Sequence, residues 1–460
     1  MVNCNEENPD KSAKRMDFSW SAITESLREA RSRTLALVGD LNHEQMIGAR
    51  LDIVNPLFWE IGHIAWFQEY WVLRHLQRRK PILANGDALY DSAKVAHETR
   101  WDLTLPSKSG TFVYLQNVLD QVLDLCESEK ASRRFEEAAY FLSLVLLHED
   151  MHDEAIAYTR QTLGYSKPGF ADGRETKPSP EQTERIKDEP SPKTLGDAMI
   201  PGGSFVLGSA PDRPFVFDNE MGAHEVEVEP FAISRTALTN AEFVAFVEDR
   251  GYERRELWIG EGWRWRQSVA AQHPVYWLRD GKKWFCREFN DVVSLNERLP
   301  VLHVNWYEAD AYCRWAGRRL PTEAEWEMAA GAESTTDDQS ITKQKRRFPW
   351  GDEPPTPERA NLDWRVMGCV DVRLLPAGDS AFGCRQMIGN VWEWTASDFA
   401  AYPGFVPGPY KEYSAPWFGN HKVLRGGCWA TRSRLIHNAY RNFYPPDRRD
   451  VWAGFRTCAL

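Results

Sequence analysis

The chain has 460 residues, which is more than one ordinary hydrophobic core holds, so we expect two or three domains. Its formal charge is −11, and no basic stretch is long enough to follow a phosphate backbone, which argues against nucleic acid as a partner. No apolar run reaches the length of a membrane span, and the polar N-terminus lacks a signal-peptide core. These features predict a cytoplasmic protein without a membrane partner, in which the eight scattered cysteines are reduced thiols.

The first predicted domain, residues 17–165, is a four-helix bundle. Four of its segments repeat apolar residues at steps of three and four, which is the pattern of helices with one buried face. Four such helices in sequence predict a bundle. The segments are residues 19–41, 55–76, 111–128 and 133–164.

Three histidines in this domain form a candidate metal site. His148 and His152 are four residues apart and therefore share one helix face, and His63 lies on an apolar helix that a bundle would turn inward. A single histidine on an apolar face is usually a core residue, but the spaced pair favours a metal site. Three imidazoles suit zinc or ferrous iron, and spacing does not choose between them. We expect Glu154 and Asp150 to orient a ligand imidazole through its other N–H group.

Residues 166–196, rich in proline, lysine and glutamate, are predicted to be a linker. Residues 197–460 follow as an α+β domain, because short strand-like runs alternate there with glycine, proline and a few helical segments. Thr322 and Glu325 have the spacing of a helix capping box. The predicted helices are residues 239–251, 305–317 and 321–331.

The second domain resembles the formylglycine-generating-enzyme-like domain, a fold related to C-type lectins, over nearly all of its length. The resemblance rests on the phrases "IPGGSFVLGS", "RRLPTEAEWEMAA", "GNVWEWTAS", "VLRGGCWAT" and "YRNFYPPDRRDVWAGFRTCAL", in that order. The two copper-binding cysteines of that family correspond here to Thr431 and Ile436. Cys428, at a serine position of the family turn, is therefore read as a small buried hydrophobic residue.

The first domain, with "NPLFWEIGHIAWFQEYWVL" and "HEDMHDE", resembles the DinB-type bundle of the ergothioneine and selenoneine synthase family. These enzymes are mononuclear non-haem iron oxidoreductases that use dioxygen to bond sulfur or selenium to C2 of the imidazole of hercynine. The resemblance implies Fe(II) as cofactor, dioxygen as co-substrate, and His63, His148 and His152 as iron ligands. Parts of both domains look more like the selenoneine branch.

The same resemblance implies roles for residues of the second domain. The hercynine pocket would include Asn442 and Phe443, followed by Tyr444, because aromatic faces attract a quaternary ammonium group. A tyrosine near the iron supplies a proton or electron in this family, and the candidates are Tyr410 and Tyr90, with Tyr444 third. The alternative reading of residues 441–449 is a packing turn of the fold.

Two departures from the mycobacterial members concern the chalcogen donor. Met151 stands where those members have glutamine, and Ala96 and Thr99 stand where two arginines bind γ-glutamylcysteine, so that Arg100 alone remains to bind substrate. Without two guanidinium groups the site has no bidentate grip on a dicarboxylate. Free cysteine or a selenosugar is therefore the favoured small-molecule donor.

Two other functions stay open at this stage. The histidines could bind zinc in a DinB-type thiol transferase, or they could fill core positions in a non-catalytic lectin-like binding protein. If the enzyme reading holds, the site lies where the two domains meet. Three tryptophans of the second domain, Trp392, Trp394 and Trp429, are assigned to its core.

Overall fold

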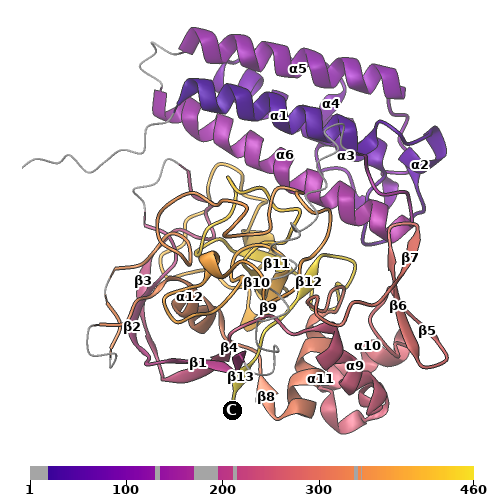
Figure 1. The fold of residues 1–460 in the computed structure, drawn as a ribbon. Helices are drawn as coiled ribbons and strands as arrows, with labels where there is room; N and C mark the ends of the chain where they lie inside the picture. The colour runs from indigo at the N-terminus through magenta and orange to yellow at the C-terminus, as the bar shows by residue number, and fades with distance from the viewer. Residues whose placement is uncertain (1–18, 130–134, 170–194, 211–214, 336–339, 343) are drawn as a thin grey trace, which may run out of the picture.

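The computed structural model shows a helical bundle packed on a mixed α+β domain, as the sequence predicts (Figure 1). It describes residues 19–129, 135–169, 195–210, 215–335, 340–342 and 344–460. Residues 170–194 of the predicted linker lie outside this described part. Within the described residues, no helix combines the length and the apolar character needed to cross a membrane.

The bundle consists of four long helical segments. Helix α6 faces the second domain, whereas α5 lies on the far side of the bundle (Figure 1). The second long segment is buried on all sides and continues directly into a π-helix, η1, a distortion that is frequent at functional sites. The long segments are α1 (Trp20–Val38), α3 (Leu57–Gln68) with η1 (Glu69–Leu76), α5 (Lys108–Glu129) and α6 (Phe135–Leu163); the short ones are α2 (His43–Ile47), α4 (Gly86–Tyr90) and η2 (His97–Thr99).

Short sheets form the frame of the second domain. In the central one, β10 pairs antiparallel with both β9 and β11, and β12 runs parallel to β9. Among the described residues of this domain, the four sheets are β1 (Asp197–Ile200), β4 (Phe231–Ser234), β13 (Cys458–Ala459) and β8 (Arg318–Arg319); β11 (Asn442–Tyr444), β10 (Lys422–Arg425), β9 (Trp392–Asp398) and β12 (Ala453–Gly454); β2 (Gly203–Leu207) and β3 (His224–Val228); and β5 (Trp277–Asp280), β6 (Lys283–Glu288) and β7 (Asp291–Ser294).

The helices of this domain include the three that the sequence predicts. Thr322 and Glu325 form the expected capping box, in which each side chain accepts a hydrogen bond from the backbone N–H of the other residue. The helices are α9 (Asn240–Glu248), α10 (Gly260–Ser268), α11 (Trp306–Ala316) and α12 (Glu323–Gly331), with 3₁₀ turns η3 (Gly251–Glu253), η4 (Arg255–Leu257), η5 (Pro376–Gly378) and η6 (Ala415–Trp417).

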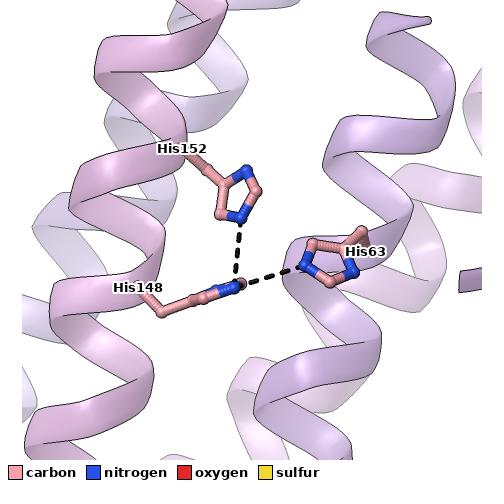
Figure 2. Close-up of side chains that lie close together, drawn as sticks. All are labelled: His63, His148 and His152. Carbon is pink, nitrogen blue, oxygen red and sulfur yellow. Dashed lines mark hydrogen bonds between the residues drawn. The ribbon is translucent and has the colours of Figure 1, made fainter. Parts of the chain in front are cut away.

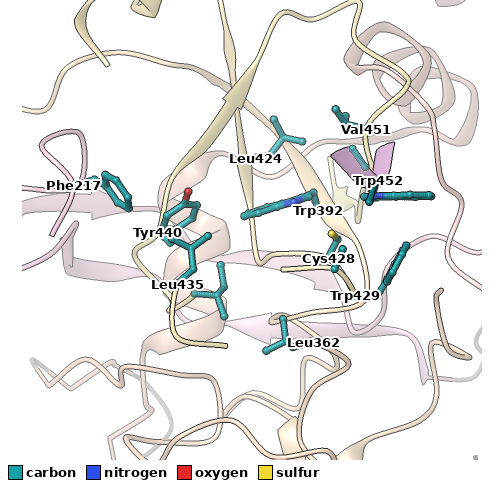
Figure 3. Packing of buried hydrophobic residues seen from close by; sticks show 14 of the residues in the cluster. Phe217, Leu362, Trp392, Leu424, Cys428, Trp429, Leu435, Tyr440, Val451 and Trp452 are labelled. Atoms are coloured by element: carbon teal, nitrogen blue, oxygen red, sulfur yellow. The ribbon is translucent and has the colours of Figure 1, made fainter. Parts of the chain in front are cut away.

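Large aromatic side chains fill the core of the second domain (Figure 3). Trp392, Trp394 and Trp429 are buried there, as predicted. Cys428 is also buried, and burial raises the pKa of its thiol well above the usual value, so it is not a thiolate at neutral pH. Trp392 also connects the two domains, because its indole N–H donates a hydrogen bond to Glu154 of α6.

Charged and polar contacts join α6 and α1 to the second domain. Arg434 donates two hydrogen bonds to the buried carboxylate of Asp150, at 2.7 and 2.6 Å, and a third to Glu29 at 2.9 Å. Near the end of α6, Gln161 donates to the backbone carbonyl of Arg287 at 2.8 Å. These contacts fix one face of the bundle against the second domain.

Candidate metal centre

Three imidazoles from two helices converge at the buried side of α6 (Figure 2). Nε2 of His148 lies 3.3 Å from Nε2 of His63 on α3 and 3.1 Å from Nε2 of His152. His148 and His152 are one helical turn apart, and the packing of α3 on α6 adds the third ring. The three nitrogens lie within 4.8 Å of one another, a spacing that could hold one metal ion.

The hydrogen bonds of the other ring nitrogens set the tautomers. Nδ1 of His63 lies 2.8 Å from the carbonyl oxygen of Tyr90, and Nδ1 of His152 lies 2.5 Å from Oε1 of Glu60. Both Nδ1 atoms must donate, so in the neutral rings both Nε2 atoms carry lone pairs. A neutral His148 has at most one Nε2 proton, which it can donate to only one of these two neighbours, so the two short Nε2 contacts cannot both be hydrogen bonds. A bound cation would accept a lone pair from each Nε2 atom, so the donor set fits a metal.

Burial keeps the rings of His63 and His148 neutral. Burial, and next the charge of His152, lower the pKa of His63 to about 3, and the same two causes lower the pKa of His148 well below its usual value. The ring of His148 stacks on Phe67 with centroids 3.5 Å apart, and its buried Nδ1 has no hydrogen-bond partner among the described residues. Neutral imidazole is the form that binds metals.

Glu60 is a site residue that the sequence reasoning missed. Its Oε2 accepts a hydrogen bond from Asn55 at 2.8 Å, and Asn55 in turn accepts one from Arg100 at 2.6 Å. Burial works to raise the pKa of Glu60, but the charge and hydrogen bond of His152 outweigh it and hold the pKa below its usual value. The sequence feature that could have identified Glu60 is its spacing, because it precedes His63 by three residues and shares its helix face.

The prediction that Glu154 and Asp150 orient an imidazole is wrong. Glu154 accepts hydrogen bonds from Trp392 at 2.6 Å and Thr431 at 2.7 Å, and Asp150 is held by Arg434. Two residues along an α-helix correspond to a rotation of about 200°, so side chains two positions from a ligand histidine point away from it. Both carboxylates therefore face the second domain.

The two candidate tyrosines occupy different places. Tyr410, in the loop between β9 and β10, lies edge-on to Phe67 at 4.9 Å and 6.3 Å from the ring of His148. Burial is the largest of the causes that raise its pKa to about 12, so its hydroxyl keeps its proton at neutral pH. Tyr90 contributes its carbonyl to His63, while its buried ring packs against Gly62. The structure thus brings Tyr410, rather than the hydroxyl of Tyr90, to the histidines.

The predicted hercynine-pocket residues form strand β11, and their side chains lie on its two opposite faces. Side chains alternate along a strand, so Asn442 and Tyr444 share one face and Phe443 lies on the other. Phe443 stacks on Phe399 at 4.0 Å. Tyr444 lies toward the bundle, where the charges of Tyr158 and Glu154 help to raise its pKa beyond the main effect of burial.

Arg100 and Met151 lie beside the cluster. The Arg100 guanidinium covers the ring of Trp59 at 3.8 Å and donates to Asn55 and to the carbonyl of Val95, so two of its nitrogens are already engaged. The sulfur of Met151, the residue before His152, accepts hydrogen bonds from two tyrosine hydroxyls that the sequence reasoning did not select. They are those of Tyr413 at 3.7 Å and Tyr440 at 3.4 Å.

Comparison with known proteins agrees with this architecture. The chain matches the DinB superfamily over residues 26–156 and the sulfatase-modifying factor enzyme 1-like domain over residues 182–459. It is 36% identical over 444 residues to a hercynine oxygenase of Mycolicibacterium thermoresistibile, with 94% of each chain covered. It is 34% identical to that of Mycolicibacterium smegmatis, covering 94% of this chain and 97% of the relative. A formylglycine-generating enzyme of Streptomyces coelicolor is 33% identical over 59% of this chain and 92% of its own.

Fold and site together define a two-domain protein in which a DinB-superfamily bundle presents a three-histidine cluster beside a sulfatase-modifying-factor-like domain. The similarity to three mycobacterial relatives extends over 94% of the chain and therefore spans both domains. The chain belongs to the hercynine oxygenase family.

Proposed function

We propose that the protein is an oxygen-dependent iron enzyme that bonds a chalcogen to C2 of the hercynine imidazole. The observation that carries this proposal is the convergence of three imidazole Nε2 atoms on one point, in a chain similar to hercynine oxygenases over 94% of its length. His63, His148 and His152 would hold Fe(II), which supplies one-electron chemistry toward dioxygen when bound. Three histidines leave further positions of the ion for substrates.

The residues around the cluster orient the ligands and handle a proton. The carbonyl of Tyr90 and the carboxylate of Glu60 fix the ring planes of His63 and His152. The hydroxyl of Tyr410 is a proton donor at neutral pH because its pKa is about 12. We assign it the proton-transfer role, since its ring is beside that of His148.

Aromatic side chains of the second domain would hold hercynine. A trimethylammonium group is attracted to the faces of aromatic rings, and such rings crowd the domain boundary beside α6. Tyr413 lies 5.9 Å from both Tyr410 and Phe443, which connects the predicted pocket to the histidine cluster. Tyr444 approaches the bundle from the opposite face of β11.

The donor is proposed to be a selenosugar or free cysteine rather than γ-glutamylcysteine, with the selenosugar first. Met151 places a thioether, held by Tyr413 and Tyr440, where a polar amide would contact a polar donor. Arg100 is committed to Asn55 and to the ring of Trp59, so it is not free to form a guanidinium fork with a carboxylate.

The test is mass spectrometry of products after anaerobic loading with Fe(II) and exposure to air. Hercynine is supplied with an equimolar mixture of selenosugar, cysteine and γ-glutamylcysteine. A selenium adduct supports the selenoneine branch, a sulfoxide adduct of cysteine supports the sulfur branch, and an adduct of γ-glutamylcysteine contradicts the donor assignment. If the iron-loaded protein forms no adduct with any of the donors, the hercynine assignment itself is contradicted.

Two variants show whether turnover depends on the cluster. His148→Ala should lose bound iron and product together. His97→Gln is the matched control, because His97 is a bundle histidine outside the cluster whose Nε2 contacts the carbonyl of Val54 at 2.7 Å. The same donor set also fits zinc, so product formed without dioxygen by zinc-loaded protein would favour a thiol transferase instead.

A further inference from the structure

The loop between β9 and β10, residues 399–421, carries the tyrosine to which the proposed function gives a proton. The ring of Tyr410 lies 4.9 Å from Phe67 and 6.3 Å from His148, both in the bundle. The residues directly before and after Tyr410 are exposed to solvent. An exposed loop keeps a side chain at a fixed place only if other contacts hold the loop there.

The backbone of this loop does little to fix it to the rest of the molecule. Among the described residues, the backbone hydrogen bonds within residues 402–417 are local ones that close turns. Such bonds shape the loop but do not attach it to the bundle or to the sheets. They run from the N–H of Phe405 to Tyr402, from that of Tyr413 to Tyr410 and from that of Trp417 to Ser414.

The carboxylate of Asp218 attaches the loop to another part of the second domain. Its Oδ2 accepts a hydrogen bond from the backbone N–H of Gly408 at 3.1 Å, and its Oδ1 accepts one from the hydroxyl of Ser414 at 2.5 Å. Asp218 and Ser414 are both buried. The two donors lie on either side of Tyr410 in the chain, so one carboxylate holds both ends of the stretch that carries this tyrosine.

The segment that contains this carboxylate lies between the loop and the bundle. The ring of Phe217 stacks on Tyr413 of the loop at 4.5 Å and meets Tyr440 edge-on at 5.9 Å. Figure 3 shows Phe217 beside Tyr440. Phe215 contacts Tyr140 of α6 at 5.2 Å. The position of the carboxylate is therefore fixed by packing on both sides.

The environment of Asp218 makes its two hydrogen bonds difficult to replace. Burial, the largest cause, raises the pKa of this carboxyl, and the hydrogen bonds from Ser414 and Gly408 act in the opposite direction. A buried carboxylate is costly unless its oxygens have donors. Because the loop supplies these two donors, movement of the loop away from Asp218 is opposed by the loss of both bonds.

We propose that Asp218 is a positioning residue, which holds Tyr410 beside the histidine cluster by binding the loop at Gly408 and Ser414. Its contacts are with the loop, so its effect reaches the chemistry through Tyr410. The consequence for turnover rests on the proposed function. The position of the loop can be measured without it.

Four variants separate the hydrogen bonds from the charge. Asp218→Ala removes both acceptors, and Ser414→Ala removes one bond. Asp218→Asn keeps both bonds, because its amide oxygen can accept from Gly408 and its NH₂ group can donate to the hydroxyl oxygen of Ser414. Ser380→Ala is the matched control, since Ser380 is also buried and its hydroxyl accepts the N–H of Cys384 at 3.2 Å in another loop of the domain.

The first measurement is hydrogen–deuterium exchange of the full-length, metal-free protein, followed by mass spectrometry of peptides from residues 399–421. In Asp218→Ala we expect exchange from Gly408 to Ser414 to become at least about tenfold faster, with a smaller increase in Ser414→Ala. Asp218→Asn and Ser380→Ala should exchange as the wild type does. Thermal unfolding checks that each variant is folded, and Ser414→Ala decides the result if Asp218→Ala does not fold.

The second measurement is the rate of product formation by iron-loaded protein. Displacement of Tyr410 should lower kcat of Asp218→Ala roughly 10- to 100-fold, whereas Asp218→Asn should stay within about threefold and Fe(II) affinity should not change. In a Tyr410→Phe background the same alanine substitution should cost less than about twofold, because the hydroxyl through which it acts is gone. A merely structural role would give the same fold-loss in both backgrounds.

Several results would overturn the proposal. They are unchanged exchange in folded Asp218→Ala, faster exchange without loss of kcat, and equal fold-losses with and without the Tyr410 hydroxyl. If Tyr410→Phe has no measurable rate, failure of Asp218→Asn to retain activity would count against the proposal instead. If the wild type forms no product at all, the proposed function fails, and the exchange measurement alone still accepts or rejects the placement of the loop by Asp218.

Discussion

The carboxylate of Glu60 should strengthen metal binding indirectly, through its hydrogen bond to the predicted ligand His152. It accepts the Nδ1 proton of His152 at 2.5 Å and is itself held by Asn55, whose amide oxygen is occupied by Arg100. In Glu60→Gln the amide oxygen of the new side chain would turn to Asn55, because Asn55 offers an N–H there. The amide NH₂ would then face His152 and favour the tautomer whose Nε2 carries the proton.

Loss of a hydrogen-bond partner behind a ligand histidine typically lowers metal affinity about 10- to 100-fold. Because the variant also disfavours the ligand tautomer, we expect a loss near the upper end, which corresponds to about 2.7 kcal/mol. The assay is anaerobic titration of Fe(II), and separately of Zn(II), into metal-free protein with a competing chelator. Urea unfolding of the metal-free variant separates this loss from a change in stability.

Glu69→Gln is the matched control for this experiment. Glu69 is also buried in the bundle, but its carboxylate accepts from Tyr114 at 2.6 Å and from the backbone N–H of Ile82 at 3.0 Å, and neither partner is a histidine. It should change stability without changing metal affinity. Equal affinities of wild type and Glu60→Gln within about twofold, or an equal loss in Glu69→Gln, would refute the reasoning.

Three further predictions concern stability and packing. His303 has a folded pKa of about 3 and an unfolded value near 6.5, so the unfolded chain binds one more proton between these values. Its contribution to the free energy of unfolding should fall by roughly 1.4 kcal/mol per pH unit as the pH drops below 6.5, and the slope should be smaller in His303→Gln when urea melts are compared. Arg434→Ala removes the two hydrogen bonds that hold the buried carboxylate of Asp150 and leaves it only the more distant Arg432, at 4.0 Å, so it should cost about 3 kcal/mol in the same assay. Gly62→Ala places a methyl group 2.2 Å from the ring of Tyr90, so it should displace the carbonyl that holds His63 and lower metal affinity in the chelator titration.

Each of these predictions has an internal check. Arg50→Ala removes an ion pair with Asp102 whose side chains are 52% and 67% exposed, and it should cost less than about 1 kcal/mol. Gly110→Ala, near the start of α5, meets only mild contacts and should leave metal affinity unchanged. A pH slope in His303→Gln as steep as that of the wild type would show that this imidazole is not buried in its neutral form.

Some features of the site follow from the sequence because they depend on local geometry. Residues four apart on a helix share a face, so the spacing of His148 and His152 was enough to predict a convergent pair. The capping box at Thr322 and Glu325 is likewise complete within four residues. Helical periodicity before the predicted linker, and short strand-like runs after it, indicated the order of the two domains.

Other features depend on which surfaces the helices and strands turn toward each other. The sequence could propose both Glu154 and Asp150 as partners of a ligand histidine, but the packing of α6 directs them to the second domain and brings Glu60 from α3 to His152. Tyr410 joins the cluster across about 260 residues of chain, a contact that no local pattern encodes.

The sequence therefore determined the elements and the local spacing of ligands. Tertiary packing decided which carboxylate and which tyrosine meet the histidines, because long-range contacts depend on how whole surfaces fit.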